Sequence, residues 1–200
     1  MTYTPTPDQQ VAEYLYKTDL PGLWFVEHKK FSDERGFYAE LSRIPEIEEL
    51  IGQSFTIKQM NLSYSQQYVT RGFHAENWNK LITCITGTCL AVLADIRPNS
   101  PTFKTTQQFL LGDGADCLNG SLFVSAGIAN SLCVLEGSAN YLYAVDQLYA
   151  ERDTSGDVAI SLFDKDLNVA WPIQTEKMIL SERDQSAITL REKYSEAFSE

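Results

Sequence analysis

The chain has 200 residues, of which 44% are hydrophobic and 22% charged, so it is long enough for one folded domain and unlike a disordered protein. Its formal net charge of −11 argues against nucleic acid or an anionic membrane as the main partner, because both bind basic surfaces. No apolar run is long enough to predict a membrane span, and residues 1–10 show no signal-peptide pattern, so we expect a cytoplasmic protein.

Short β-like runs, separated by turn residues, dominate the chain from Gly22 onward. In chain order, the sequence predicts a helix at 11–17, strands at 23–27 and 37–41, a helix at 44–51, strands at 55–65, 81–86, 88–96, 105–111, 121–124, 131–136 and 139–145, and a helix at 188–198. Strands this closely spaced leave no room for crossover helices. They therefore favour antiparallel pairing in an all-β sandwich or barrel with few short helices.

Chemistry that depends on a metal or a bound cofactor is not indicated. The chain has two histidines, His28 and His74, and neither belongs to an HxH or HExxH pattern. A metal site needs about three converging ligands, and Asn130 stands where a later strand would offer a second histidine. Glycine patterns for phosphate binding and a GxSxG elbow are also missing from the sequence. We therefore expect a site without metal and without cofactor.

Histidine, lysine and tyrosine together suit proton abstraction next to a carbonyl group. A histidine supplies a base that works near neutral pH, and a lysine can stabilise the enolate oxygen that forms. A tyrosine can deliver a proton to the opposite face of the ring. His74 follows an Arg-Gly pair and precedes a strand-like run, which favours it over His28 as the base.

Nine segments between residues 22 and 190 carry a resemblance to a known family. They are Phe31–Glu40, Phe55–Ser65, Val69–Glu76, Asn79–Leu81, Asp95–Phe103, Ala126–Glu136, Tyr141–Tyr149, Leu162–Pro172 and Leu180–Asp184. Because all nine segments occur in the family's order, the chain resembles the dTDP-4-dehydrorhamnose 3,5-epimerase family. The resemblance implies a single cupin-type jelly-roll domain, with residues 1–20 as an N-terminal extension. It also implies a homodimer with strand exchange and a 4-keto-6-deoxy sugar on a nucleoside diphosphate as substrate.

The resemblance assigns catalytic roles to four residues. It places the base at His74, the opposing acid at Tyr143 and the enolate-holding lysine at Lys80. The carboxylate partner of the base falls on Asp164.

Further positions match the family's binding residues. Arg71 and Gln59 match nucleotide and phosphate contacts, while Arg35 and Glu40 match contacts to the nucleotide end across the dimer. Arg183 falls on a basic position near the C-terminus.

The sequence departs from the family inside the expected pocket. Asn130 replaces a histidine and Glu76 replaces a glutamine, and both are expected to contact substrate. Thr154 replaces a glutamate, Asn79 replaces a glycine, and Trp78 adds bulk nearby. These changes predict retained proton chemistry with an altered sugar, or inversion at one carbon instead of two. They do not predict which nucleotide carries the sugar.

Two other functions compete with an epimerase that acts at C3, C5 or both. A 3,4-ketoisomerase would use the same base to move the ketone. A non-catalytic sugar-nucleotide-binding cupin would have lost the chemistry, as the changes at Asn130 and Glu76 suggest.

Overall fold

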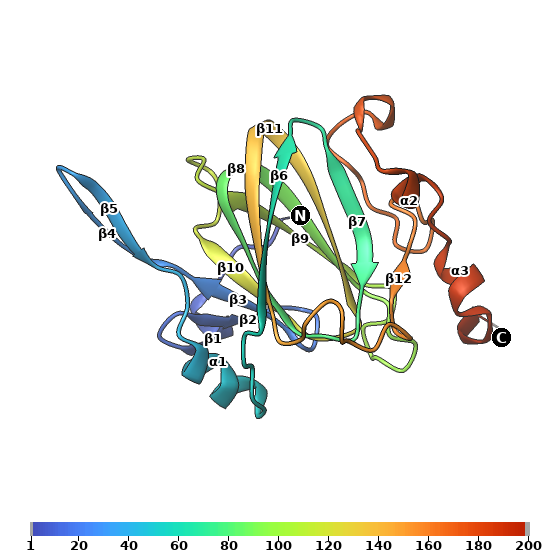
Figure 1. The fold of residues 1–200 in the computed structure, drawn as a ribbon, viewed down its shortest axis with the longest axis horizontal. Coiled ribbons are helices and arrows are strands. Elements are labelled where there is room, and N and C mark those ends of the chain that lie inside the picture. The colour runs from blue at the N-terminus through green and yellow to red at the C-terminus, as the bar shows by residue number, and fades with distance from the viewer. Residues whose placement is uncertain (1, 199–200) are drawn as a thin grey trace.

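The structure, a computed structural model, describes residues 2–198 and is built mainly from antiparallel strands (Figure 1). Ten strands within this range form one continuous hydrogen-bonded sheet: β1 (Gln10–Ala12), β2 (Leu15–Lys17), β3 (Leu23–Glu27), β6 (Gln59–Gln66), β7 (Thr70–Ala75), β8 (Lys80–Asp95), β9 (Thr106–Gly112), β10 (Gly120–Val124), β11 (Ile128–Val145) and β12 (Val158–Ala159). Two further strands, β4 (Lys29–Asp33) and β5 (Gly36–Glu40), form a separate hairpin. The predicted all-β class is confirmed.

Two long strands, β8 and β11, belong to both layers of the sandwich. Residues 80–86 of β8 pair with residues 140–145 of β11, and β10 and β6 flank them. Residues 88–95 pair with residues 128–136, and β9 and β7 flank those. The strands therefore pass from one layer to the other near their midpoints.

The main hydrophobic core lies between the two layers. One fully buried cluster combines side chains from both: Phe25, Ile82 and Leu122 from the first, and Leu93, Phe109 and Leu132 from the second. Burying a side chain of this size stabilises the fold by about 1.5–3 kcal/mol. Burial of side chains from both layers in one cluster thus holds the two layers face to face.

Glycines mark the bends of the long strands. Gly87 has φ +89° and Gly137 has φ +65°, which is backbone that residues with a Cβ rarely adopt. The sequence predicted turns at these positions, and therefore four separate strands where the structure has two. A glycine inside a strand pattern can bend the strand without ending it.

Helices are few and short, as predicted. α1 (Ile44–Ile51) has the predicted bounds and ends at Gly52 in the left-handed conformation. The prediction for 11–17 is wrong, because this segment forms β1 and β2, and β2 pairs with β3. Pairing with β3 buries Leu15 and outweighs the helical pattern of the segment. The remaining helical segments are η1 (Pro7–Gln9), η2 (Thr175–Lys177), α2 (Glu182–Gln185), α3 (Leu190–Lys193) and η3 (Ser195–Phe198).

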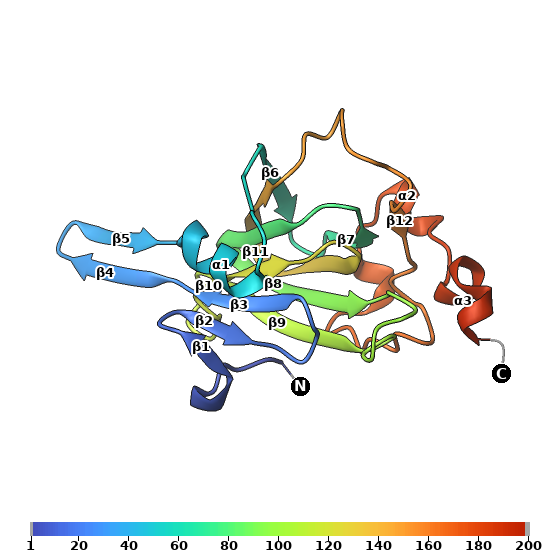
Figure 2. The same cartoon turned by 90° about the horizontal axis from the view of Figure 1, so that it is seen from below.

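The β4–β5 hairpin extends away from the body, at the end opposite α2 and α3 (Figures 1 and 2). Its large apolar side chains Phe31, Phe37 and Tyr38 are 53%, 64% and 72% exposed. Within the described residues, no helix combines the length and apolar character that crossing a bilayer requires.

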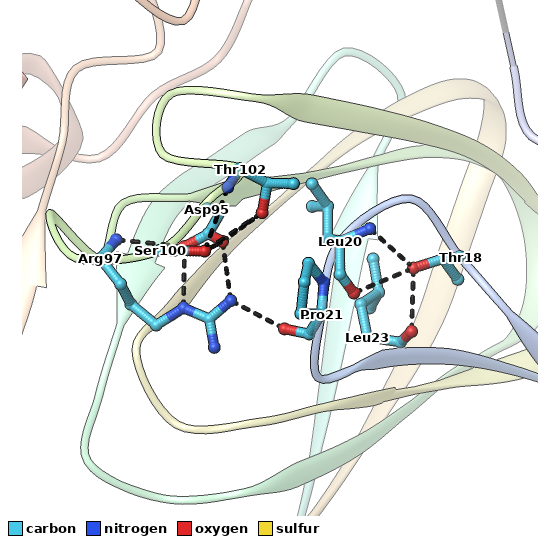
Figure 3. A network of polar contacts seen from close by, with 8 residues as sticks. All are labelled: Thr18, Leu20, Pro21, Leu23, Asp95, Arg97, Ser100 and Thr102. Carbon is cyan, nitrogen blue, oxygen red and sulfur yellow. Dashed lines mark hydrogen bonds and ion pairs between the residues drawn. The ribbon is translucent and has the colours of Figure 1, made fainter.

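A buried carboxylate, Asp95, ties the β8–β9 connection to the N-terminal segment (Figure 3). Arg97 donates Nε to Asp95 Oδ1 at 2.8 Å and Nη2 to the Pro21 carbonyl at 2.7 Å. Thr102 Oγ1 donates to Asp95 Oδ2 at 2.6 Å. Burial raises the pKa of Asp95, but the hydrogen bonds from Arg97, Ser100 and Thr102 outweigh it and leave the pKa below its usual value.

We predict that Asp95→Asn lowers the free energy of unfolding by about 2–3 kcal/mol, because buried donors lose a charged acceptor. Urea denaturation measures the loss. Because the folded-state pKa of Asp95 is depressed, its contribution is present at neutral pH and fades as the pH falls through that lowered pKa. Asp166→Asn is the control, since its partner Arg191 is exposed, and it should cost less than about 1 kcal/mol. Equal losses in the two variants would contradict the prediction.

Candidate active site

A cavity of about 230 Å³ opens where β6 and β7 diverge along the two halves of β11. Its walls come from β6, β7, the β7–β8 turn, the start of β8 and both ends of β11. The lining residues are Asn61, Ser63, Arg71, His74, Glu76, Trp78, Lys80, Asn130, Tyr143 and Val145. Six positions that were predicted separately along the chain therefore meet in one pocket: Arg71, His74, Glu76, Lys80, Asn130 and Tyr143.

An irregularity in β7 brings Arg71 and His74 to the same wall. These residues are three apart, so in a regular strand their side chains would lie on opposite faces. The register shifts between the pairs Asn130–His74 and Leu132–Arg71, which supplies the extra residue. Gly72, with φ +122°, lies so close to β11 that an added Cβ would fall 2.4 Å from the Ser131 side chain. The glycine of the RGFH motif is thus required by close packing of the backbone.

A buried carboxylate, Asp184, orients the His74 imidazole. His74 Nε2 lies 2.6 Å from Asp184 Oδ1. Burial raises the pKa of Asp184, but its hydrogen bonds with His74 and Ser181 outweigh this and lower the pKa below the usual value. Because an ionised carboxylate can only accept, Nε2 carries the hydrogen and Nδ1 keeps its lone pair. Nδ1 has no hydrogen-bond partner among residues 2–198, so it can accept a proton.

The assignment of Asp164 as partner of the base is wrong. Asp164 is buried, and its Oδ1 accepts from the backbone N–H groups of Asp166 and Leu167 at 2.8 and 3.1 Å. Its Oδ2 accepts from the Leu190 N–H at 2.7 Å, at the start of α3. Asp164 therefore holds a turn and a helix terminus, and it does not reach His74.

Lys80 forms a buried polar cluster with two of the unusual residues. Its side chain is 3% exposed, and its Nζ contacts the carboxylate of Glu76 and donates to Asn130 Oδ1 at 2.7 Å. Burial raises the pKa of Glu76, but attraction to Lys80 and the hydrogen bond from it outweigh burial, so the pKa lies below the usual value. Glu76 is therefore ionised at neutral pH and offsets the charge of Lys80.

Tyr143 lies on the opposite wall from β7. It is paired with Asn61 of β6, and its ring lies 5.2 Å from that of the fully buried Tyr141. Burial raises the pKa of Tyr143 to about 12, so its phenol keeps its proton at neutral pH. A phenol in this state can act as a proton donor.

The other predicted binding residues are divided between the pocket and the surface. Arg71 donates Nε to Ser65 Oγ at 3.0 Å on the pocket wall. Gln59 precedes the pocket-lining part of β6 and accepts from the Tyr149 N–H at 2.8 Å. Arg183 is exposed beside Asp184, and it does not line the pocket.

Two predicted residues lie on or beside the distant hairpin. Arg35 pairs with Asp33 at the exposed hairpin tip, and Glu40 pairs with Arg43 at the hairpin base. A single chain therefore does not bring Arg35 or Glu40 to the pocket.

Sequence reasoning missed Asn61 and Ser63 as lining residues. They alternate with the exposed Met60, Leu62 and Tyr64 along β6. An unbroken alternation of polar and large apolar residues at 60–64 is the signal that could have identified them. Within residues 2–198, no group of three or more His, Cys, Asp or Glu side chains is arranged to hold a metal ion.

Comparison with known proteins matches most of the chain to one family. The sequence profile described as dTDP-4-dehydrorhamnose 3,5-epimerase matches residues 17–192. The chain is 33% identical over 173 residues to the dTDP-4-dehydrorhamnose 3,5-epimerase of Shigella flexneri, covering 84% of this chain and 91% of the relative.

Two solved structures resemble the whole fold. One is a 4-keto-6-deoxy sugar epimerase from the novobiocin biosynthetic gene cluster of Streptomyces spheroides, with a TM-score of 0.82, 27% identity and coverage of 91% and 89% of the two chains. The other is a dTDP-6-deoxy-D-glucose-3,5-epimerase from Legionella pneumophila in complex with dTDP-4-keto-L-rhamnose. It has a TM-score of 0.79, 30% identity and coverage of 92% and 95%. These likenesses confirm the predicted jelly-roll fold.

The two buried aspartates should behave differently when replaced. We predict that Asp164→Ala lowers the free energy of unfolding by about 3 kcal/mol, because three backbone N–H groups lose their acceptor. Asp184→Ala should cost about 1 kcal/mol but shift the imidazole nitrogen signals of His74. Urea unfolding and ¹⁵N NMR measure both effects. Unchanged His74 signals in Asp184→Ala, or changed ones in Asp164→Ala alone, would contradict the assignment.

Proposed function

The chain belongs to the dTDP-4-dehydrorhamnose 3,5-epimerase family, and we propose that it inverts C3, C5 or both in a nucleoside-diphosphate 4-keto-6-deoxy sugar. Family membership confirms the predicted enzyme class, a carbohydrate epimerase. One observation carries the mechanism. A base, a cation and a phenol, contributed by His74, Lys80 and Tyr143, line a single pocket.

The first step is proton removal by His74. A C4 ketone acidifies the hydrogens on C3 and C5, because the electron pair left behind moves onto the ketone oxygen. The lone pair on His74 Nδ1 takes the proton, and the imidazolium that forms is stabilised by Asp184 at 2.6 Å from Nε2. A positioned base of this kind contributes a factor of about 10²–10⁴ to the rate.

The second step is stabilisation of the enolate. The ketone oxygen gains negative charge, and the Lys80 ammonium is the buried cation of the pocket that can donate to it. Removing a single donor to such an oxyanion costs a factor of about 10²–10³ in rate. Little reorganisation is needed, because Lys80 is already held by its neighbours.

The third step is proton return by Tyr143. His74 approaches from β7 and Tyr143 from the end of β11 that pairs with β6, so the two groups serve different sides of a bound ring. The phenol donates its proton to carbon, the enolate collapses to the ketone and the centre inverts. His74 then releases the proton that it took to solvent, and Tyr143 takes a proton from solvent, which restores both groups.

A second copy of the chain completes the site in this proposal. The diphosphate needs cations, yet within the pocket Lys80 is offset by Glu76, which leaves Arg71. We infer a homodimer in which the β4–β5 hairpin of one subunit adds to the other's sheet and brings Arg35 and Glu40 to the nucleotide end.

Exposed apolar surface supports this dimer. The hairpin has no strand partner in its own chain within residues 2–198, and β6 pairs there with β11 alone. Met60, Leu62 and Tyr64 on β6 are 59–64% exposed, next to the edge that a partner hairpin would extend. Exposed edges and apolar faces of this kind are the ones that association covers.

The ketoisomerase and the binding module remain testable alternatives. A ketoisomerase would use the same base and yield a 3-keto product. A binding module would hold the sugar nucleotide without proton exchange. The expected cytoplasmic location and the expected absence of metal and cofactor stay predictions.

We predict that His74→Ala lowers solvent-deuterium uptake at C3 and C5 by at least about 10²-fold, whereas Tyr143→Phe keeps uptake but loses inversion. The phenol acts after the proton has left, so the two variants separate the steps. Nuclear magnetic resonance of 4-keto-6-deoxy sugars linked to dTDP, GDP or CDP in heavy water measures both, and it identifies which carbon and which nucleotide are used.

Tyr194→Phe is the matched control, because Tyr194 does not line the pocket and should keep full activity. Uptake that survives in His74→Ala would overturn the role of the base. A 3-keto product would favour the isomerase, and wild-type protein that binds without exchange would favour the binding module.

We predict that the wild-type chain sediments as a dimer and that Leu62→Glu shifts it to a monomer by placing a charge in the interface. Arg35→Ala should remain dimeric but raise KM by roughly 10–100-fold, the loss of one charged hydrogen bond. Phe163→Glu, an exposed apolar residue away from β6 and the hairpin, is the control and should stay dimeric. Sedimentation velocity and steady-state kinetics measure these outcomes. A wild-type protein that is active as a monomer would contradict the proposed dimer.

A further inference from the structure

Lys80 is the most completely buried cation of the pocket. Its side chain is 3% exposed, while that of its partner Glu76 is 14% exposed. Moving an ammonium out of water is strongly unfavourable unless a counter-charge and hydrogen bonds replace the lost hydration. The carboxylate of Glu76 and the amide oxygen of Asn130 supply both.

The hydrogen bonds of Lys80 leave one direction free. An ammonium group carries three hydrogens, and two of them are directed at Glu76 and Asn130. The third has no acceptor among residues 2–198. Because Lys80, Glu76 and Asn130 all line the same cavity, that hydrogen is available to a ligand oxygen.

The backbone of Lys80 is fixed as firmly as its ammonium. The preceding residue, Asn79, donates its backbone N–H to Asp146 Oδ1 at 3.1 Å and its side-chain Nδ2 to Asp146 Oδ2 at 2.8 Å. Its Oδ1 accepts from the Ala126 N–H at 3.1 Å. Lys80 is therefore held at both ends, which is what a preorganised donor needs.

Other charged and titratable groups surround the pair. His74 and Arg71 on β7 and Tyr143 on β11 line the same cavity, and the exposed Arg183 on α2 adds a positive charge near Glu76. The negative charge of Glu76 adds to burial in raising the pKa of Tyr143 to about 12. Glu76 thus favours the protonated form of the Tyr143 phenol.

We propose that Glu76 is a positioning residue that acts through Lys80: its carboxylate clamps the ammonium against Asn130 so that the remaining N–H meets the ketone oxygen. The ketone in this statement rests on the proposed function. The consequence is that kcat depends on Glu76 more than KM does, although Glu76 itself transfers no proton.

Glu76→Gln tests the proposal, because it keeps the shape of the side chain and removes its charge. We expect kcat to fall by about 10²-fold while KM changes little, since misplacing a catalytic group by about 1 Å has an effect of that size. The Lys80 ¹³Cε signal, assigned with Lys80→Met, should shift in Glu76→Gln, because the ammonium loses its charged neighbour. Asn130→Ala removes the uncharged acceptor of the same clamp, so it should also lower kcat and leave KM little changed.

The double variant Glu76→Gln/Lys80→Met shows whether Glu76→Gln merely damages the fold, because it leaves no unpaired charge in the pocket. It should unfold at least as late as Glu76→Gln in urea and yet have little activity. An unchanged kcat and an unchanged Lys80 ¹³Cε signal in Glu76→Gln would overturn the proposal. Wild-type protein without proton exchange would instead defeat the proposed epimerisation, while the Lys80 ¹³Cε signal would still report whether Glu76 holds the ammonium.

Discussion

The continuity of β11 through both layers is the constraint from which the pocket arises. Its residues 138–145 pair with β6 and its residues 130–133 pair with β7, so β6 and β7 must separate where the strand bends at Gly137. The gap between them is lined by side chains of β11 itself. Asn130 and Tyr143 are 13 residues apart in sequence, yet they reach the same cavity because one strand serves both layers. A break in β11 would separate Tyr143 from the rest of the site.

The charges of the pocket differ in sign from those of the chain. The chain as a whole has a formal net charge of −11, yet the lining residues include two basic side chains, Arg71 and Lys80, against one carboxylate, Glu76. A low-dielectric wall strengthens the field of these few charges, so an acidic protein can still present a site suited to an anionic ligand. Asp184 lies behind His74, where it acts on the imidazole through a hydrogen bond. The arrangement directs positive charge toward the ligand and keeps the second carboxylate out of its way.

Local sequence patterns predicted the two longest strands in pieces and most of their neighbours, but they missed β7, which carries Arg71 and His74. They also did not reveal which distant segments meet. The glycines at 87 and 137 resemble turns because the local pattern cannot distinguish a strand that bends from one that ends. His74, Lys80 and Tyr143 were placed by motif, and they do share a pocket. The resemblance assigned the partner of the base to Asp164, and Asp184 was missed because motif order alone cannot say which aspartate returns to β7. A local clue existed, since Asp164 accepts from the N–H groups two and three residues ahead, as structural aspartates in turns do. Ser181 accepts from the Asp184 N–H three residues later and so starts the short helix that holds the carboxylate in place.

The two unusual residues at positions 76 and 130 make sense as a pair. An asparagine at 130 is neutral over the whole pH range in which a histidine would titrate, so it contributes an oxygen acceptor and no charge. The amide at 130 brings no charge to the buried Lys80, and a carboxylate at 76 supplies the counter-charge from the other side. Changing position 76 alone to an uncharged residue would leave the Lys80 ammonium without its counter-charge. Changing position 130 alone to a histidine would place a second group that can carry positive charge beside the Glu76–Lys80 pair. Because the energetics of buried charges couple such neighbours, the two departures from the family are best explained as one adjustment around Lys80. The adjustment changes how the cation is held and leaves His74 and Tyr143, the two groups to which the proposed mechanism assigns proton transfer, in the same pocket.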